Sequence, residues 1–76
     1  MNYLTGEEMH VGDRVLFGGH AATVVVVIDR GEYGPGFVAE DWSDQEHGFL
    51  MRTDDGTLYM YDVADEDVRL IARAAQ

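Results

Sequence analysis

The stretch DRVLFGGHAATVVVVID, residues 13–29, decides the fold of this chain. In residues 13–17 the side chains alternate in direction, with Val15 and Phe17 on one face of a predicted strand. Gly18–Gly19 then supplies two residues that tolerate positive φ, which a tight chain reversal requires. This half of the stretch therefore predicts a strand followed by a hairpin turn.

The returning segment, residues 21–29, contains the β-branched run Val24–Ile28. An unbroken β-branched run favours strand over helix. Apolar side chains fall on both faces of this strand, so both faces must be covered. That is typical of the central strand of a barrel or of a tightly bent sheet.

Three further strands are expected on the C-terminal side, at residues 48–53, 57–61 and 68–72. Asp54-Asp55-Gly56 is the strongest hairpin signal in the chain. Gly31–Phe37 is expected to be a loop, and Val38–Glu46 to be irregular or a single turn. The sequence thus predicts an all-β fold of five short strands with one long loop after the second strand, best buried by curling into a small barrel.

The segments Val11–Val15, Gly18–Gly19 and Ala22–Val25 resemble the opening hairpin of SH3-like barrels of the KOW and Tudor type. The resemblance implies a single SH3-like β-barrel domain over residues 1–76. It departs from the KOW pattern where the usual glycine of the returning strand is replaced by Ala21–Ala22. KOW modules commonly bind RNA or ribosomal and transcription proteins. The chain also resembles, more loosely, small acidic bacterial immunity and inhibitor proteins.

Charge limits the class of partner. Fifteen Asp and Glu face five basic residues, all arginine, which gives a net charge of −10 on 76 residues. Such a surface repels nucleic-acid phosphate and anionic lipid and attracts basic proteins. We therefore expect no direct binding to nucleic acid or to a membrane. No signal peptide or membrane span is visible, and a cytoplasmic location is expected.

No catalytic or metal-binding pattern is present, so we expect a non-enzymatic protein without a cofactor or metal. His10, His20 and His47 lack the spacing of a zinc site. The acidic stretch Asp62–Asp67 lacks the order of a calcium loop. No serine-hydrolase, P-loop or dinucleotide motif occurs, and a barrel this small leaves no deep pocket.

Aromatic residues among acids are the candidate binding surface. Rings bordered by carboxylates suit a cationic guest, such as an arginine of a partner or, more remotely, a methylated lysine or arginine. The alternative is that Trp42 and Phe37 belong to the core and that the acids only keep the domain soluble. The predicted partner-binding residues are Tyr33, Asp41, Trp42, Asp44, Glu46, Tyr59, Tyr61, Asp62, Asp65, Glu66 and Asp67.

The leading hypothesis is an inhibitor or immunity-type protein that masks a basic surface on a toxin or nucleic-acid-binding protein. One alternative is a regulatory or assembly module that binds basic peptides or forms a homodimer. Another is a phage-type decoy that mimics DNA. A KOW-type nucleic-acid binder would need a basic stripe, and the five arginines are too scattered to form one.

Overall fold

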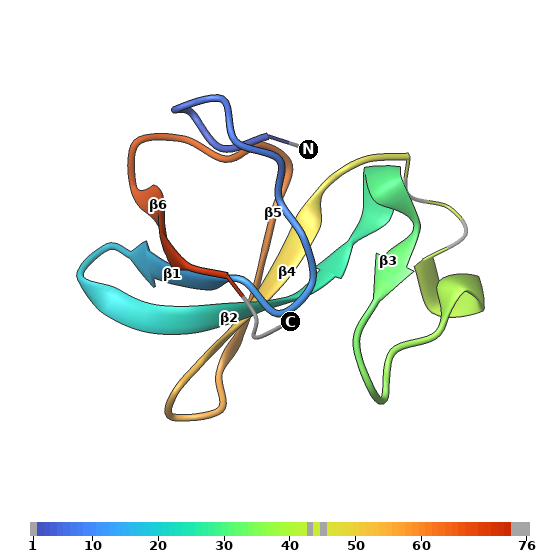
Figure 1. The fold of residues 1–76 in the computed structure, drawn as a ribbon. Coiled ribbons are helices and arrows are strands. Elements are labelled where there is room, and N and C mark those ends of the chain that lie inside the picture. Colours follow the sequence, from blue (N-terminus) through green and yellow to red (C-terminus); the bar gives the residue numbers. More distant parts are fainter. Residues whose placement is uncertain (1, 43, 45, 74–76) are drawn as a thin grey trace.

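The centre of the fold is an antiparallel hairpin of β1 (Arg14–Phe17) and β2 (His20–Val27). The computed structural model describes residues 2–42, 44 and 46–73 (Figure 1). The other strands are β3 (Glu32–Tyr33), β4 (Phe49–Thr53), β5 (Leu58–Tyr61) and β6 (Val68–Ala72), and two short 3₁₀ turns are η1 (Ile28–Arg30) and η2 (Ala39–Trp42). The fold is all-β, as predicted.

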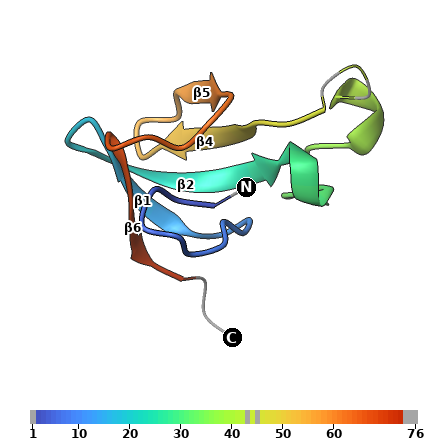
Figure 2. The same ribbon diagram turned by 90° about the horizontal axis from the view of Figure 1, so that it is seen from above.

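All strand pairs are antiparallel, and the sheet order is β5-β4-β2-β1-β6, with β3 paired to the end of β2. The last strand therefore returns to lie beside the first. Figure 2 shows β2 running through the middle of the molecule, with β4 and β5 on one side and β1 on the other. Within the described part of the chain no pairing joins β5 to β6, so the sheet is curled but not closed by backbone hydrogen bonds. The closed five-stranded barrel is thus not confirmed.

Both turns expected in the sequence are present. Gly18 and Gly19 have φ angles of 53° and 87°, and the strands on either side pair in register from Phe17↔His20. The Asp54–Gly56 turn connects β4 to β5, with the Thr53 amide donating to the Thr57 carbonyl. These reversals set the register of the sheet.

Strand β2 is covered on both faces, as predicted, but the alternation is interrupted. Val24 and Val27 pack into the main core inside the curl of the sheet, whereas Val25 and Val26 pack into a smaller core on its outer side. A register shift against β4 between Val24 and Val26 accounts for this, because a bulge places two successive residues on one face.

The strand β3 was not predicted, because its two residues lie inside the expected Gly31–Phe37 loop. The segment is held against β2 by Gly34, whose amide donates to the Val25 carbonyl at 2.7 Å. A Cβ atom at Gly34 would lie 2.8 Å from that carbonyl oxygen, so only glycine permits this approach. The described residues therefore form six strands where five were expected.

The N-terminal segment closes one side of the main core. Tyr3 and Met9 are both buried there, with Phe49, Met51 and Val68 among their neighbours in the cluster. The described residues include no helix long and apolar enough to cross a membrane.

Candidate functional site

A groove of about 350 Å³ lies between the N-terminal loop and the β5–β6 connection with β6. We call it the acidic groove; it is lined by Leu4, Thr5, Glu7, Asp65, Glu66, Val68, Arg69 and Leu70. Its apolar part is formed by the leucines and valine, and three carboxylates and one guanidinium are the charged groups in its lining. Figure 1 shows the two walls, the blue loop near the N-terminus and the orange connection leading into β6.

The first wall is a tight loop whose tip is Leu4–Thr5. The Tyr3 amide donates to the Glu7 carbonyl at 2.9 Å, and the Gly6 amide donates to the Tyr3 carbonyl at 2.9 Å. The Thr5 hydroxyl donates to the Glu7 carboxylate. The side chain of Leu4 is left 68% exposed at the tip. An apolar side chain is therefore held in solvent next to a carboxylate.

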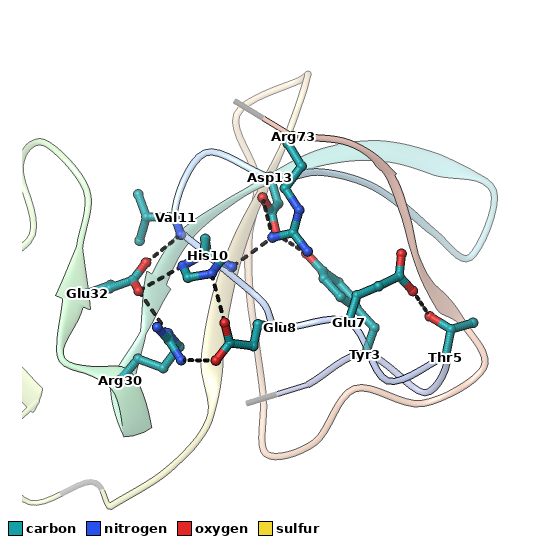
Figure 3. A network of polar contacts seen from close by, with 10 residues as sticks. All are labelled: Tyr3, Thr5, Glu7, Glu8, His10, Val11, Asp13, Arg30, Glu32 and Arg73. Carbon is teal, nitrogen blue, oxygen red and sulfur yellow. Dashed lines mark hydrogen bonds and ion pairs between the residues drawn. The ribbon is translucent and has the colours of Figure 1, made fainter. Parts of the chain in front are cut away.

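The buried carboxylate of Asp13 anchors this loop through hydrogen bonds. Its carboxylate is 1% exposed and accepts from the Tyr3 hydroxyl at 2.8 Å, from the His10 amide at 3.0 Å and from Arg73 at 3.2 Å (Figure 3). Burial, together with the hydrogen bond to Asp13, raises the pKa of the Tyr3 hydroxyl. Because a buried carboxylate is costly unless it is hydrogen-bonded and paired, these three donors hold the ends of the segment in one arrangement.

Glu32 on β3 fixes the chain between the loop and Asp13. Its carboxylate accepts from the Val11 amide at 3.0 Å and from Arg30 at 2.9 Å, and it faces Nδ1 of His10 at 3.0 Å (Figure 3). Burial opposes ionisation, but the hydrogen bonds from Arg30, Val11 and His10 outweigh it and lower the pKa of Glu32 to about 2. Arg30 also donates to Glu8 at 2.9 Å.

His10 lies between two carboxylates of this network. Its Nδ1 faces Glu32, and its Nε2 lies 3.5 Å from the Glu8 carboxylate. Since both ring nitrogens face carboxylates, the arrangement serves to hold the N-terminal segment on β3. No cluster of three or more side chains suited to a metal ion is found in residues 2–42, 44 and 46–73.

The second wall is the connection between β5 and β6. Asp65 stabilises its own turn, because its carboxylate accepts from the Asp67 amide at 2.9 Å and its carbonyl accepts from the Val68 amide at 3.1 Å. The Asp67 carbonyl accepts from the Gly18 amide at 3.1 Å, which ties the connection to the β1–β2 turn. Asp65 and Glu66 remain exposed and line the groove.

The predicted site residues fall into separate groups. Tyr33 and Trp42 pack with Phe37 onto the outer core, so the alternative reading of Trp42 and Phe37 as core residues agrees with their position. The Nε1 atom of Trp42 is buried without a hydrogen-bond partner among the described residues. The remaining members on this side are exposed acids: Asp41, Asp44 and Glu46.

Tyr59 and Tyr61 lie on β5, and Asp62 follows Tyr61 directly. Tyr59 is 40% exposed, and its ring packs 5.1 Å from that of Phe17. Tyr61 is half-buried against Phe17 and Phe49. Tyr61 is therefore part of the margin of the core, and Tyr59 keeps an accessible edge.

The acids around Trp42, which are Asp41, Asp44 and Glu46, do not share one surface with the acids of the β5–β6 turn, Asp65, Glu66 and Asp67. Both views place η2 and the Asp65–Asp67 turn on different sides of the molecule (Figures 1 and 2). Asp62 lies beside Gly48, since its Cα is 3.8 Å from where a side chain at Gly48 would begin. Of the predicted residues, Asp65 and Glu66 are the two that line the groove.

Sequence reasoning missed the N-terminal half of the groove. Leu4 and Glu7 are separated from Asp65 by some sixty positions, and no local pattern links them. The available signal was the apolar pair Tyr3 and Met9 on either side of the polar stretch 5–8, which marks the points where the loop enters the core.

Comparison with known proteins finds no match to any family model, curated protein or solved structure.

Proposed function

We propose that this chain is a non-enzymatic acidic binding module that masks a basic surface of a partner protein, as an inhibitor or immunity-type protein does. The observation that carries the proposal is the juxtaposition of exposed Leu4 with the carboxylates of Glu7, Asp65 and Glu66 in one groove. The partner is a toxin or a nucleic-acid-binding protein, and the setting is cytoplasmic.

An arginine or lysine side chain fits the chemistry of this groove. Its aliphatic stem packs on Leu4 and Leu70, and its charged head reaches the carboxylates at the rim. Arginine is favoured over lysine, because its planar guanidinium binds carboxylate in a fixed two-point geometry. Arg69 at the same groove offers a donor for an acidic or carbonyl group beside that side chain.

The charge of the whole domain supports the same partner class. The arginines are largely engaged within the protein: Arg14 pairs with Asp54, Arg30 with Glu8 and Glu32, and Arg73 with Asp13. The remaining acids, on a domain with net charge −10, steer a basic partner toward the surface. Steering raises the association rate, whereas the apolar contacts in the groove set the dissociation rate.

For the fold we propose an open form of the SH3-like barrel. Two features support it: the last strand, β6, pairs with the first, β1, and the curled sheet is bridged by side chains where β5 faces β1. The N-terminal loop then covers one end of the barrel and adds a groove to the surface there.

The test is an affinity capture with two matched variants. The groove variant carries Glu7→Gln, Asp65→Asn and Glu66→Gln, and the control variant carries Glu40→Gln, Asp41→Asn and Glu46→Gln. Both remove three exposed carboxylates, so they have the same net charge. Native lysate is passed over each immobilised protein, washed at low and high salt, and the retained proteins are identified by mass spectrometry.

The proposal predicts that the wild type and the control variant retain one basic protein in stoichiometric amount through the high-salt wash, and that the groove variant loses it. Equal loss from both variants would mean that retention depends on net charge alone, and the groove would have no specific role.

A further inference from the structure

We infer that the free edge of β5 is a second binding surface, which pairs with an extended segment of a basic partner as an added strand. The inference rests on the proposed function for the charge of the partner. It adds a different location and a different mode of recognition, through backbone groups.

The free edge follows from the sheet order, in which β5 is a terminal strand. Within residues 2–42, 44 and 46–73, no strand pairs with its outer side. Figure 2 shows β5 as the outermost strand on its side of the sheet. An unpaired edge presents a row of backbone donors and acceptors that another extended chain can use.

The register identifies which backbone groups point outward. Just before β4, the Gly48 carbonyl accepts from the Ile28 amide at the end of β2, and at the end of β4 the Thr53 amide donates to the Thr57 carbonyl on the β5 side. Hydrogen bonding alternates along an antiparallel strand, so the odd-numbered residues of β4 bond to β5. Their partners on β5 are Tyr59 and Tyr61, which leaves the amides and carbonyls of Leu58 and Met60 directed at the free edge.

The side chains at this edge are apolar and accessible. Leu58 is 48% exposed and Met60 is 39% exposed, and both lie on the outer face of the sheet. Leu58 is opposite Arg52, whose guanidinium lies over the ring of Phe37 at 5.6 Å. An incoming strand would therefore find apolar neighbours for alternate side chains, in addition to four backbone groups.

Charge selects the occupant. Acidic residues flank the edge, with Asp55 in the turn before β5 and Asp62 directly after it. Two copies pairing antiparallel through Leu58 and Met60 would place each Asp62 opposite the Asp55–Gly56 turn of the other copy, and each copy carries a net charge of −10. A segment with apolar residues alternating with arginine or lysine has the complementary charge.

The experiment uses a capped hexapeptide of alternating arginine and valine as the probe, with a glutamate–valine hexapeptide as the control peptide. The variant Met60→Lys keeps the backbone amide but repels the probe. Ile71→Lys is its matched control, since it makes the same charge change at a 57% exposed residue of β6. Met60→Pro removes the outward amide itself.

We expect the arginine–valine peptide to slow hydrogen exchange at the Leu58 and Met60 amides by about tenfold or more. Its affinity falls about tenfold in Met60→Lys and changes less than about twofold in Ile71→Lys. If Met60→Pro remains folded by its amide spectrum, it also loses the peptide.

Three results would overturn the inference. Spectral changes confined to residues 4–7 and 65–70 would show binding in the acidic groove alone, and the proposed function would stand without the edge site. Equal binding of the glutamate–valine peptide would show that the charge of the peptide does not determine binding at this edge. No binding of the arginine–valine peptide at either place would count against both proposals.

Discussion

Phe17 on β1 and Tyr61 on β5 meet edge to face, with ring centroids 5.1 Å apart and planes at 86°, although β2 and β4 separate their strands in the sheet. Tyr59 packs on the same phenylalanine at 5.1 Å. The sheet therefore bends until the rings of β5 contact a ring of β1, although no backbone pairing among the described residues joins the two terminal strands, β5 and β6. We call this contact the aromatic seam.

Loss of the aromatic seam should destabilise the whole domain. Phe17→Ala removes a partly buried ring and two aromatic pairs, and we expect a loss of about 2–3 kcal/mol in the free energy of unfolding. Urea denaturation followed by circular dichroism measures it. Leu58→Ala, on the exposed face of β5, is the control and should cost less than about 1 kcal/mol. Equal losses in the two variants would show that the seam does not hold the curl.

Removing the Asp13 carboxylate should reduce the free energy of unfolding more than removing one of its hydrogen-bond donors. Tyr3→Phe removes one of the three groups that donate to the carboxylate, and we expect a loss of about 1 kcal/mol. Asp13→Ala leaves the buried Tyr3 hydroxyl and Arg73 without their partner, so a loss of about 3 kcal/mol or more is expected. Thermal or urea unfolding of the two variants measures both losses. The reverse ranking would contradict the anchor.

Glu32 should make the free energy of unfolding depend on pH in the acidic range. Its pKa is lowered in the folded protein from 4.5 to about 2, so its contribution is fully present above pH 4.5 and is lost as the pH falls toward 2. In Glu32→Gln the position no longer titrates, so the drop in unfolding free energy over that interval should be smaller than in the wild type. Urea midpoints at pH 5, 4, 3 and 2.5 would test this. Parallel pH curves for the two proteins would be incompatible with the network around Glu32.

Replacing Gly34 by alanine, which adds the smallest side chain, should destabilise the protein. A methyl group there would lie 2.8 Å from the Val25 carbonyl oxygen, which is backbone and cannot rotate away. We expect Gly34→Ala to cost about 1–3 kcal/mol, as overpacking does, and to weaken the β3 contact with β2. Amide spectra of Val26 and Tyr33 report on that pairing. Unchanged amides together with unchanged stability would argue against a close approach at this glycine.

Local chemistry was enough to predict the strands that pair with their sequence neighbours. Alternation in residues 13–17, the Gly18–Gly19 turn and the Asp54–Gly56 turn each act within a few positions, and the structure contains all three. The β3 strand escaped prediction because it depends on Gly34 reaching Val25, a contact that no local pattern encodes. The open sheet likewise depends on whether β5 meets β6, which short-range signals do not determine.

The candidate site was predicted only in part, for the same reason. Asp65 and Glu66 were identified from their acid density, and they do line the groove. Leu4 and Glu7 come from the opposite end of the chain and are brought there by the burial of Tyr3 and Met9. Trp42 is conspicuous in the sequence because it is the only tryptophan, yet it packs onto the outer core.

The central claim is that the acidic groove binds a cationic side chain with an apolar stem. The most direct measurement is an amide chemical-shift titration of the labelled protein with a capped leucine–arginine dipeptide, which is too short to add a strand, at low salt. The account predicts the largest changes at residues 4–7 and 65–70, and their loss in the Glu7→Gln, Asp65→Asn, Glu66→Gln variant. Changes centred on the η2 acids, or spread evenly over all exposed carboxylates, would contradict it.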